Sequence, residues 1–267
     1  MKNKVVVITG ASSGIGAALA AECAGRGALL ALSDIHPEQA EHWLEQSGAK
    51  GLVEGLDVSH REAVLAHIAR VERELGPIDV IINNAGVALS ATVAEMSIDD
   101  FRWLMDINFW GVVYGTQSVL PGMLERNSGT IVNISSLFGL IGVPTQSAYN
   151  ASKFAVRGFT EALRAEVSGS GVKVLCVHPG GIKTNIARNS RFVTGIDGCA
   201  DKGEAVRDFD RLAKVEPAKA AKLIIDAVIK GKSRLLIGHD AKILDLLQRG
   251  FPTGYSAALT TLIAKAK

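Results

Sequence analysis

Tyr149 and Lys153 lie four residues apart within a helical pattern, in the run Tyr-Asn-Ala-Ser-Lys. On a helix, this spacing places both side chains on one face. A free tyrosine hydroxyl has a pKa of about 10, and a neighbouring cation favours its charged form. At about 4 Å and an effective dielectric constant of about 20, the attraction is about 4 kcal/mol, or roughly three pKa units before desolvation. The pair therefore predicts a tyrosine tuned for proton transfer near pH 7, although the spacing alone also occurs by chance on many amphipathic helices.

A glycine-rich turn near the N-terminus predicts a nucleotide site. The run Thr-Gly-Ala-Ser-Ser-Gly-Ile-Gly from Thr9 to Gly16 joins the first expected strand to the first expected helix. Glycines there permit a tight turn and let backbone N–H groups approach a pyrophosphate. Asp34 follows Gly10 by 24 residues, at the end of the second strand, where a carboxylate can bind both ribose hydroxyls and repel a 2′-phosphate. Either feature alone could be structural, the acid as a cap for the next helix; together they predict NAD.

Composition narrows the class of protein. The chain of 267 residues is 48% hydrophobic and 21% charged, which is typical of one globular domain. A net charge of +2 without a long basic block gives no support to a nucleic-acid partner. Three scattered cysteines indicate free thiols in a reducing compartment, and the six histidines show no metal-ligand spacing. We expect no metal, no signal sequence, no membrane span and a cytoplasmic location.

Short apolar runs alternate with longer helical patterns along the chain. Strands are expected at residues 5–8, 29–33, 51–56, 78–82, 130–134, 172–177 and 234–237. Helices are expected at residues 14–26, 61–75 and 148–166, after Pro37, from Ser97 and from Pro217. Strands that are buried on both faces and alternate with helices predict a parallel sheet. The fold class is therefore α/β, a Rossmann-type doubly wound, mainly parallel seven-stranded sheet in one domain, residues 1–267.

Taken together and in order, the motifs resemble those of the short-chain dehydrogenase/reductase family, in its single-domain form. The resemblance covers residues 4 to about 190. Besides the glycine turn and the Tyr149–Lys153 pair, it includes Ser136, which precedes Tyr149 by 13 residues, and Asn108. The other matching runs are Asp57-Val58, Asn83-Asn84-Ala85-Gly86 and Pro179-Gly180-Gly181-Ile182-Lys183-Thr184. Six motifs besides the Tyr149–Lys153 pair, all in the right order, make a chance match negligible.

The resemblance implies hydride transfer between NAD(H) and a secondary alcohol or ketone. Tyr149 would be the acid/base, Lys153 would lower its pKa and bind the nicotinamide ribose, and Ser136 would donate to the substrate oxygen. Asn108 would hold a helix distortion and a water that links Lys153 to solvent. Ser135 is the alternative candidate for the hydrogen bond to the substrate oxygen. Successive side chains of a strand point to opposite faces, so only one of the two serines can make it. The implied cofactor contacts, besides Tyr149 and Lys153, are Gly10, Ser12, Ser13, Gly14, Ile15, Gly16, Asp34, Ile35, Asp57, Val58, Asn84, Ala85, Gly86, Pro179, Gly180, Ile182 and Thr184.

Three alternatives stay open. A non-catalytic dinucleotide sensor or scaffold would be marked by loss of Tyr149, Lys153 or Ser136, and all three are present. A nucleotide-sugar epimerase or dehydratase would need a separate substrate domain, for which residues 190–267 are too few. An NADPH-dependent biosynthetic ketone reductase would carry basic residues near the glycine turn or after the second strand. This chain has Ala-Ser-Ser from Ala11 and Asp-Ile-His from Asp34 at those places.

Substrate and assembly are expected from the remaining segments. The apolar run at residues 137–144, with residues 87–89 and the substrate loop at 185–216, predicts a largely apolar alcohol or ketone, although part of the run could pack under the sheet. A C-terminal helical extension, residues 239–267, should pack over the substrate entrance or at a subunit contact, with membrane-surface binding as the rival. The family resemblance implies a homodimer or homotetramer. The two apolar stripes of the extension are Ile243, Leu244, Leu247, Phe251 and Tyr255, Leu259, Leu262, Ile263.

Overall fold

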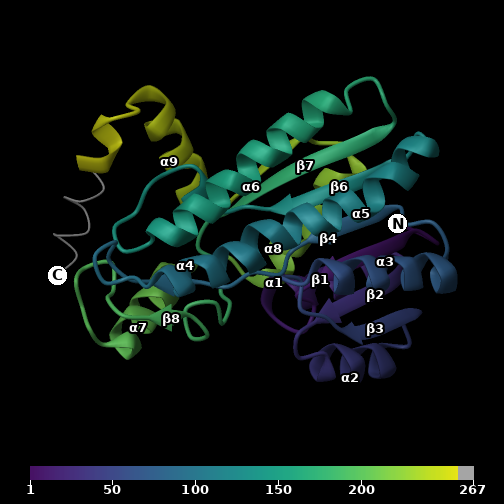
Figure 1. Ribbon diagram of the computed structural model, residues 1–267, viewed down its shortest axis with the longest axis horizontal. Helices are drawn as coiled ribbons and strands as arrows, with labels where there is room; N and C mark the ends of the chain where they lie inside the picture. Colours follow the sequence, from purple (N-terminus) through teal and green to yellow (C-terminus); the bar gives the residue numbers. More distant parts are fainter. Residues whose placement is uncertain (258–267) are drawn as a thin grey trace.

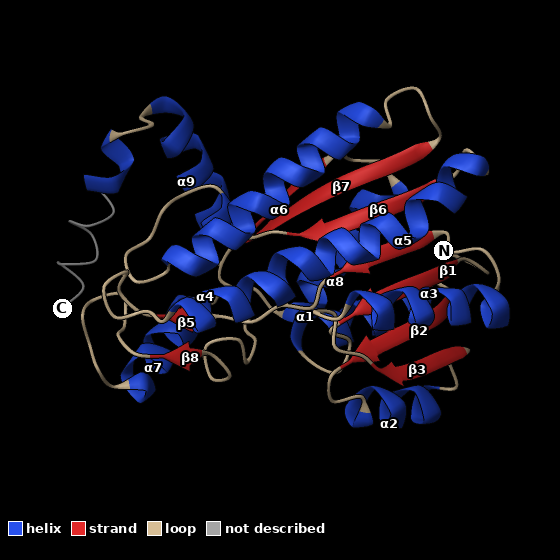
Figure 2. Cartoon of the chain, in the orientation of Figure 1, coloured by secondary structure: helices blue, strands red, loops and turns tan. Residues whose placement is uncertain are grey.

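The structure, a computed structural model, describes residues 1–257 and contains one seven-stranded sheet. Every pairing is parallel, and the strand order is β3-β2-β1-β4-β6-β7-β9. The Rossmann-type fold expected from the sequence is confirmed (Figure 2). The strands are β1 (Val5–Thr9), β2 (Leu29–Asp34), β3 (Gly51–Gly55), β4 (Val80–Asn83), β6 (Gly129–Ile134), β7 (Val172–Pro179) and β9 (Arg234–Ile237).

Helices cover both faces of the sheet because its strands are apolar on both sides (Figure 1). Along β1, Val6 and Ile8 join the core beneath one helical layer, while Val5 and Val7 join the core beneath the other. The first layer holds α1 (Gly14–Gly25), α2 (Glu38–Ser47) and α8 (Pro217–Ile229). The second holds α3 (Arg61–Leu75), α5 (Gly111–Glu125) and α6 (Ser147–Glu166).

The direction of the strand order reverses between β1 and β4. In doubly wound sheets, the connections that leave two such strands diverge and open a crevice at their carboxyl ends. The glycine turn follows β1, and the loop that begins with Asn84 follows β4. The fold therefore brings together two of the motifs that the sequence predicts to bind a cofactor.

The long helix expected after β4 is interrupted. Ser97 caps α4 (Ile98–Met105), its Oγ accepting from the Asp100 N–H at 3.0 Å, as its position before two acidic residues predicts. A π-helical turn, η1 (Asp106–Trp110), then separates α4 from α5. This turn contains the fully buried Asn108, so the expected helix distortion is confirmed.

Four elements were not predicted, namely two short strands, a helix and a 3-10 turn. A second, two-stranded parallel sheet joins β5 (Leu89–Ser90) to β8 (Arg191–Phe192), and two residues are too few to show a period. The segment expected as the substrate loop, residues 185–216, carries α7 (Lys202–Leu212), none of whose side chains is fully buried. A 3-10 turn, η2 (Leu137–Gly139), follows Ser136.

The C-terminal helix α9 (His239–Gly250) is present, but its predicted apolar stripe is buried only in part, since Leu244 packs inward and Leu247 is half-buried. Ile243 and Phe251 are each 65% exposed, whereas Ala241 and Asp245 face the protein. The reason is ionic, since both Asp245 carboxylate oxygens accept from Arg234 on β9, at 2.5 and 3.1 Å. Of the second stripe only Tyr255 lies within the described residues; Leu259, Leu262 and Ile263 lie outside them. No helix within residues 1–257 combines the length and the apolar character that crossing a membrane requires.

Candidate functional site

Ser136, Tyr149 and Lys153 meet at the carboxyl end of β6. Ser136 follows that strand, and the first turns of α6 present the other two side chains on one face. Lys153 Nζ lies 5.6 Å from the centroid of the Tyr149 ring, and the Ser136 side chain lies near enough to Tyr149 to lower the pKa of the phenol. The lysine is 3% exposed. The four-residue spacing therefore produces the expected juxtaposition.

The two neighbouring serines point in different directions, as strand alternation predicts. Ser135 is buried and donates its hydroxyl hydrogen to the Lys153 carbonyl at 2.8 Å. Ser136 instead faces Tyr149, and its Oγ accepts from the Phe138 N–H at 3.1 Å. Ser135 is thus committed to anchoring α6, and Ser136 is the serine at the tyrosine.

Asn108 connects the π-helical turn to the loop after β4. Its Oδ1 accepts from the Val87 N–H at 2.8 Å, and its Nδ2 donates to the Val87 carbonyl at 2.9 Å and to Ser152 Oγ at 3.3 Å. A Cβ added at Gly86 would lie 3.2 Å from Asn108 Oδ1 and 3.5 Å from Lys153 Nζ. The structure therefore brings Asn108 and Lys153 to the same glycine of this loop, which packs closely against both side chains.

Burial dominates the titration of this site. It raises the pKa of Tyr149 to about 12, against a smaller downward effect of the hydrogen bond with Ser136. It also lowers the pKa of Lys153 to about 8. The expectation that Lys153 alone brings the pKa of Tyr149 near 7 is therefore wrong. Its physical reason is that desolvation of both groups outweighs their attraction, and Nζ is turned to the Ile134 carbonyl, 3.0 Å away.

The glycine turn has the shape of a cradle. Gly10 and Gly14 adopt positive φ, +66° and +54°, and a Cβ on Gly10 would lie 2.8 Å from Ala85 Cα. A Cβ on Gly16 would lie 1.9 Å from the Gly10 carbonyl oxygen. No side chain caps the N-terminus of α1 at Ser13, and no acidic residue occupies its first turn. The first backbone N–H groups of this helix therefore fit a pyrophosphate.

Asp34 lies beside this cradle at the end of β2. Its carboxylate accepts from the Ser12 N–H at 3.0 Å and from the His36 N–H at 3.1 Å. Asn84 fixes the turn from the other side, because its Nδ2 donates to the carbonyls of Thr9 and Gly10 at 2.9 and 3.0 Å. A carboxylate with free lone pairs next to exposed helix amides fits the adenosine ribose and pyrophosphate of a dinucleotide.

The other predicted cofactor residues surround the same crevice less closely. Asp57 accepts from the backbone and hydroxyl of Ser59, at 2.9 and 2.7 Å, and Ile35 is 61% exposed. After β7, the segment from Pro179 crosses the glycine turn, so that Thr184 Cγ2 would lie 3.1 Å from a Cβ on Gly14. Two further predicted contacts are buried, Val58 against Gly111 and Ile182 in the core.

Of the groups that shape the site around Tyr149, sequence reasoning named the run that holds Phe138 but missed the contacts of Arg191. The Phe138 ring meets the Tyr149 ring edge-on, with 6.0 Å between centroids. Arg191 lies over the Trp103 ring at 3.7 Å and pairs with Asp100 at 2.7 Å, which ties the segment after β7 to α4. Phe138 lies in the apolar run at residues 137–144 that was expected to meet the substrate, whereas no local pattern indicates the Arg191 contacts. Nowhere in the described part of the chain do three His, Cys, Asp or Glu side chains form a metal-like cluster.

Comparisons with known proteins agree with this arrangement. Residues 4–192 match the family described as short chain dehydrogenase. The chain is 46% identical to the "Putative oxidoreductase SadH" of Mycobacterium tuberculosis, over 99% of this chain and 96% of that protein. It is similar to a short-chain dehydrogenase/reductase of Burkholderia phymatum in complex with NAD, with a TM-score of 0.86, 28% identity and coverage of 93% and 94%. A Streptomyces avermitilis short-chain dehydrogenase gives a TM-score of 0.82, 31% identity and coverage of 98% of each chain.

Proposed function

Because the chain belongs to the short-chain dehydrogenase/reductase family of oxidoreductases, we propose that it transfers a hydride between NAD(H) and a largely apolar secondary alcohol or ketone. One observation carries this proposal. Ser136, Tyr149 and Lys153 converge at the same sheet edge as the glycine cradle and Asp34. The bound dinucleotide supplies the acceptor or donor of the hydride at its nicotinamide, and the protein handles the proton.

Tyr149 is the proposed proton carrier on the substrate oxygen. In ketone reduction its hydroxyl gives the proton to the oxygen as negative charge develops there, and in alcohol oxidation the phenolate takes that proton back. Ser136 donates a hydrogen bond to the same oxygen. Lys153, with a pKa of about 8, is mostly protonated at pH 7 and so favours the phenolate. Asn108 holds the loop beside Lys153 through Val87.

NAD(H) is the proposed cofactor, and Asp34 is the reason. Its carboxylate accepts a hydrogen bond from the glycine turn and would repel a 2′-phosphate bound there. The neighbouring positions carry no lysine or arginine to bind such a phosphate; they are Ala11, Ser12, Ser13, Ile35 and His36. We expect Asp34→Ala to lower the ratio of kcat/KM with NAD to kcat/KM with NADP. The variant loses the hydrogen bonds to the ribose of NAD and also the repulsion of the 2′-phosphate of NADP. Glu38→Ala, on the exposed start of α2, removes an equal charge and should leave the ratio unchanged. Higher kcat/KM with NADP in the wild type contradicts the assignment.

The proposed substrate is apolar because the groups at the tyrosine are. Phe138 lies against Tyr149, and Val87 packs in the same small cluster as Tyr149, with Leu89 and Leu104. A panel of secondary alcohols and ketones, followed by absorbance of NADH, tests the proposal. Apolar members should have higher kcat/KM than small charged hydroxy acids of similar size. Binding of NAD without turnover of any member would favour the non-catalytic sensor instead.

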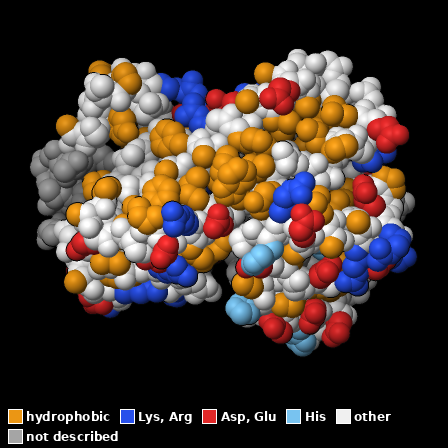
Figure 3. Space-filling view, in the orientation of Figure 1, with side chains coloured by type: hydrophobic (Ala, Val, Ile, Leu, Met, Phe, Trp, Pro, Cys, Tyr) orange, Lys and Arg blue, Asp and Glu red, His pale blue; other side chains and the backbone are white. Residues whose placement is uncertain are grey.

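A homodimer or homotetramer through α5 and α6 is the proposed assembly. Members of the family are generally oligomeric, and this surface carries exposed apolar side chains, with Trp110 43%, Leu124 43% and Phe154 40% exposed. Figure 3 shows apolar side chains gathered over the middle of the face that these helices present.

The proposed location is the cytoplasm. The buried free thiols of Cys23 and Cys176 support a reducing compartment.

A further inference from the structure

Asn150, the residue after Tyr149, is buried and uses both ends of its amide on a single loop. Its Nδ2 donates to the carbonyls of Phe138 and Ile141, each at 2.7 Å, and its Oδ1 accepts from the Val143 N–H at 3.0 Å. Three hydrogen bonds thus join α6 to three points along residues 138–143. One side chain on the helix of Tyr149 fixes the path of the loop that begins at Ser136.

The loop divides into an inner and an outer part. Leu137, Leu140 and Ile141 are between 1% and 6% exposed and pack with Ala241 of α9, so they belong to the protein interior. The alternative expected part of the run to pack under the sheet; these residues do pack in the interior, but against α9 and Leu236 of β9. Phe138 packs against this cluster too, but its ring also reaches Tyr149 edge-on. The group that the loop presents to Tyr149 is therefore the Phe138 ring. Asn150 holds the backbone of the same residue through its carbonyl.

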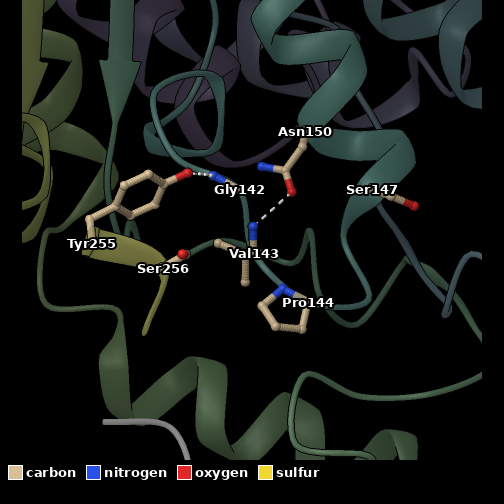
Figure 4. Close-up of a pocket in the computed structure, with 7 residues that line it drawn as sticks. All are labelled: Gly142, Val143, Pro144, Ser147, Asn150, Tyr255 and Ser256. Carbon is tan, nitrogen blue, oxygen red and sulfur yellow. Dashed lines mark hydrogen bonds between the residues drawn. The ribbon is translucent and has the colours of Figure 1, made fainter. Parts of the chain in front are cut away.

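The outer side of the loop borders a hollow of about 510 Å³ (Figure 4). There the Tyr255 hydroxyl accepts from the Gly142 N–H at 2.9 Å, a second tie next to the bond between Val143 and Asn150. Ser136, Tyr149 and Lys153 are not among the residues that line this hollow. Ser147, three residues before Asn150, lines it too, and its Oγ makes no hydrogen bond.

We infer that Asn150 is a positioning residue that holds the ring of Phe138 beside Tyr149 as the wall against which the apolar part of the substrate binds. Without the amide, two carbonyls and one N–H of the loop lose their partners, and the loop can carry the ring away from Tyr149. A wall contacts the substrate before and during the reaction alike, so its loss raises KM more than it lowers kcat. This inference rests on the proposed function, because it assigns a wall to the same substrate.

A double-mutant cycle in kcat/KM tests the inference, with the best apolar alcohol of the panel and saturating NAD. Asn150→Ala and Phe138→Ala should each lower kcat/KM about tenfold, mainly through KM, and leave the Kd of NAD unchanged. If Asn150 acts through Phe138, the double variant should also lose about tenfold. Independent losses that multiply to about a hundredfold overturn the inference.

Ser147→Ala is the matched control, since it changes the same helix face at the same hollow without removing a hydrogen bond, and it should keep the wild-type kcat/KM. Asn150→Ser, which retains one hydrogen-bonding group, replaces Asn150→Ala in the cycle if thermal unfolding shows that the alanine variant does not fold. A merely structural role predicts lower thermal stability with no coupling to Phe138, and that result also overturns the inference.

Failure of the wild type to turn over any member of the panel would contradict the proposed function, not the positioning role. The crystal structure of Asn150→Ala decides the latter without turnover. Displacement of the Phe138 ring from Tyr149 supports the inference, and an unmoved ring overturns it.

Discussion

Tyr149 is the residue on which the proposed chemistry depends most directly. Tyr149→Phe removes the proton carrier and leaves the glycine cradle intact, so kcat should become nearly undetectable while the Kd of NAD stays close to the wild-type value. Steady-state kinetics and fluorescence titration with NADH measure the two quantities. A variant that retains a tenth or more of the wild-type rate would show that another group carries the proton.

The two serines give a sharper comparison, because they are neighbours with different partners. Ser136→Ala should lower kcat about 10²–10³-fold, the loss expected for one donor to a developing oxyanion. Ser135→Ala removes only the 2.8 Å bond to the Lys153 carbonyl and should cost much less. If single-turnover rates show the larger loss for Ser135→Ala, the role of Ser136 has been assigned to the wrong residue.

At the scale of single residues, spacing predicted the juxtapositions but not the energies. The stretch from Ser136 to Lys153 brought its three side chains together as expected. The sequence predicted a lowered pKa for Tyr149, whereas burial raises it. Desolvation depends on how completely neighbours from α4, β5 and the loop after β6 bury the phenol. A linear sequence shows which charge is near but not how much water remains.

At the scale of elements, His178 on β7 predicts how stability depends on pH. The residue is fully buried, its Nδ1 lies 3.1 Å from the Ser136 carbonyl, and burial lowers the pKa of the imidazole to about 4. Arg234 and Arg157 lower it further, while the Ser136 carbonyl and Asp245 oppose the shift. Between pH 6.5 and 4 the unfolded chain binds the proton more tightly, so stability falls as pH falls, by about 3 kcal/mol over the window.

His178→Asn should abolish most of that loss, since its amide can still donate to the Ser136 carbonyl but does not titrate. Urea unfolding at pH 7 and pH 4 gives the difference for the wild type, for His178→Asn and for His42→Asn on the exposed side of α2 as control. Equal acid sensitivity in the wild type and His178→Asn would mean that other groups govern unfolding.

Sequence patterns were most informative where an element buries apolar residues at a regular period. The seven strands and the helices that cover them meet that condition, and α3 was predicted with both its ends. The elements that were missed do not meet it, because β5 and β8 have two residues each and α7 has no fully buried side chain. The buried face of α9 was predicted only in part, because Leu244 packs inward as expected but Asp245 also turns inward, to Arg234.

At the scale of the whole molecule, the C-terminal segment should influence the active site without containing any of its proposed catalytic residues. Deleting residues 252–267 removes Tyr255 and its bond to the Gly142 N–H, so the apparent KM for the alcohol should rise with little change in the Kd of NAD. Tyr255→Phe isolates this bond. Light scattering of the truncated protein checks whether the deletion also changes the oligomeric state. Unchanged kinetics and assembly, with co-sedimentation of only the full-length protein on anionic vesicles, would instead identify a membrane contact.

The π-helical turn at Asp106–Trp110 sets the phase between two halves of one long helix. A π turn holds one residue more than an α turn, so the helix that follows is rotated by about 100°. The half before it, α4, can therefore face Tyr149 through Leu104, while the half after it, α5, faces the sheet through Val119 and Met123. The positions that face inward on one half therefore do not dictate which positions face inward on the other. If one residue were removed from the turn, α4 and α5 would form one continuous helix. Leu104 could then face Tyr149, or Val119 and Met123 could face the sheet, but not both.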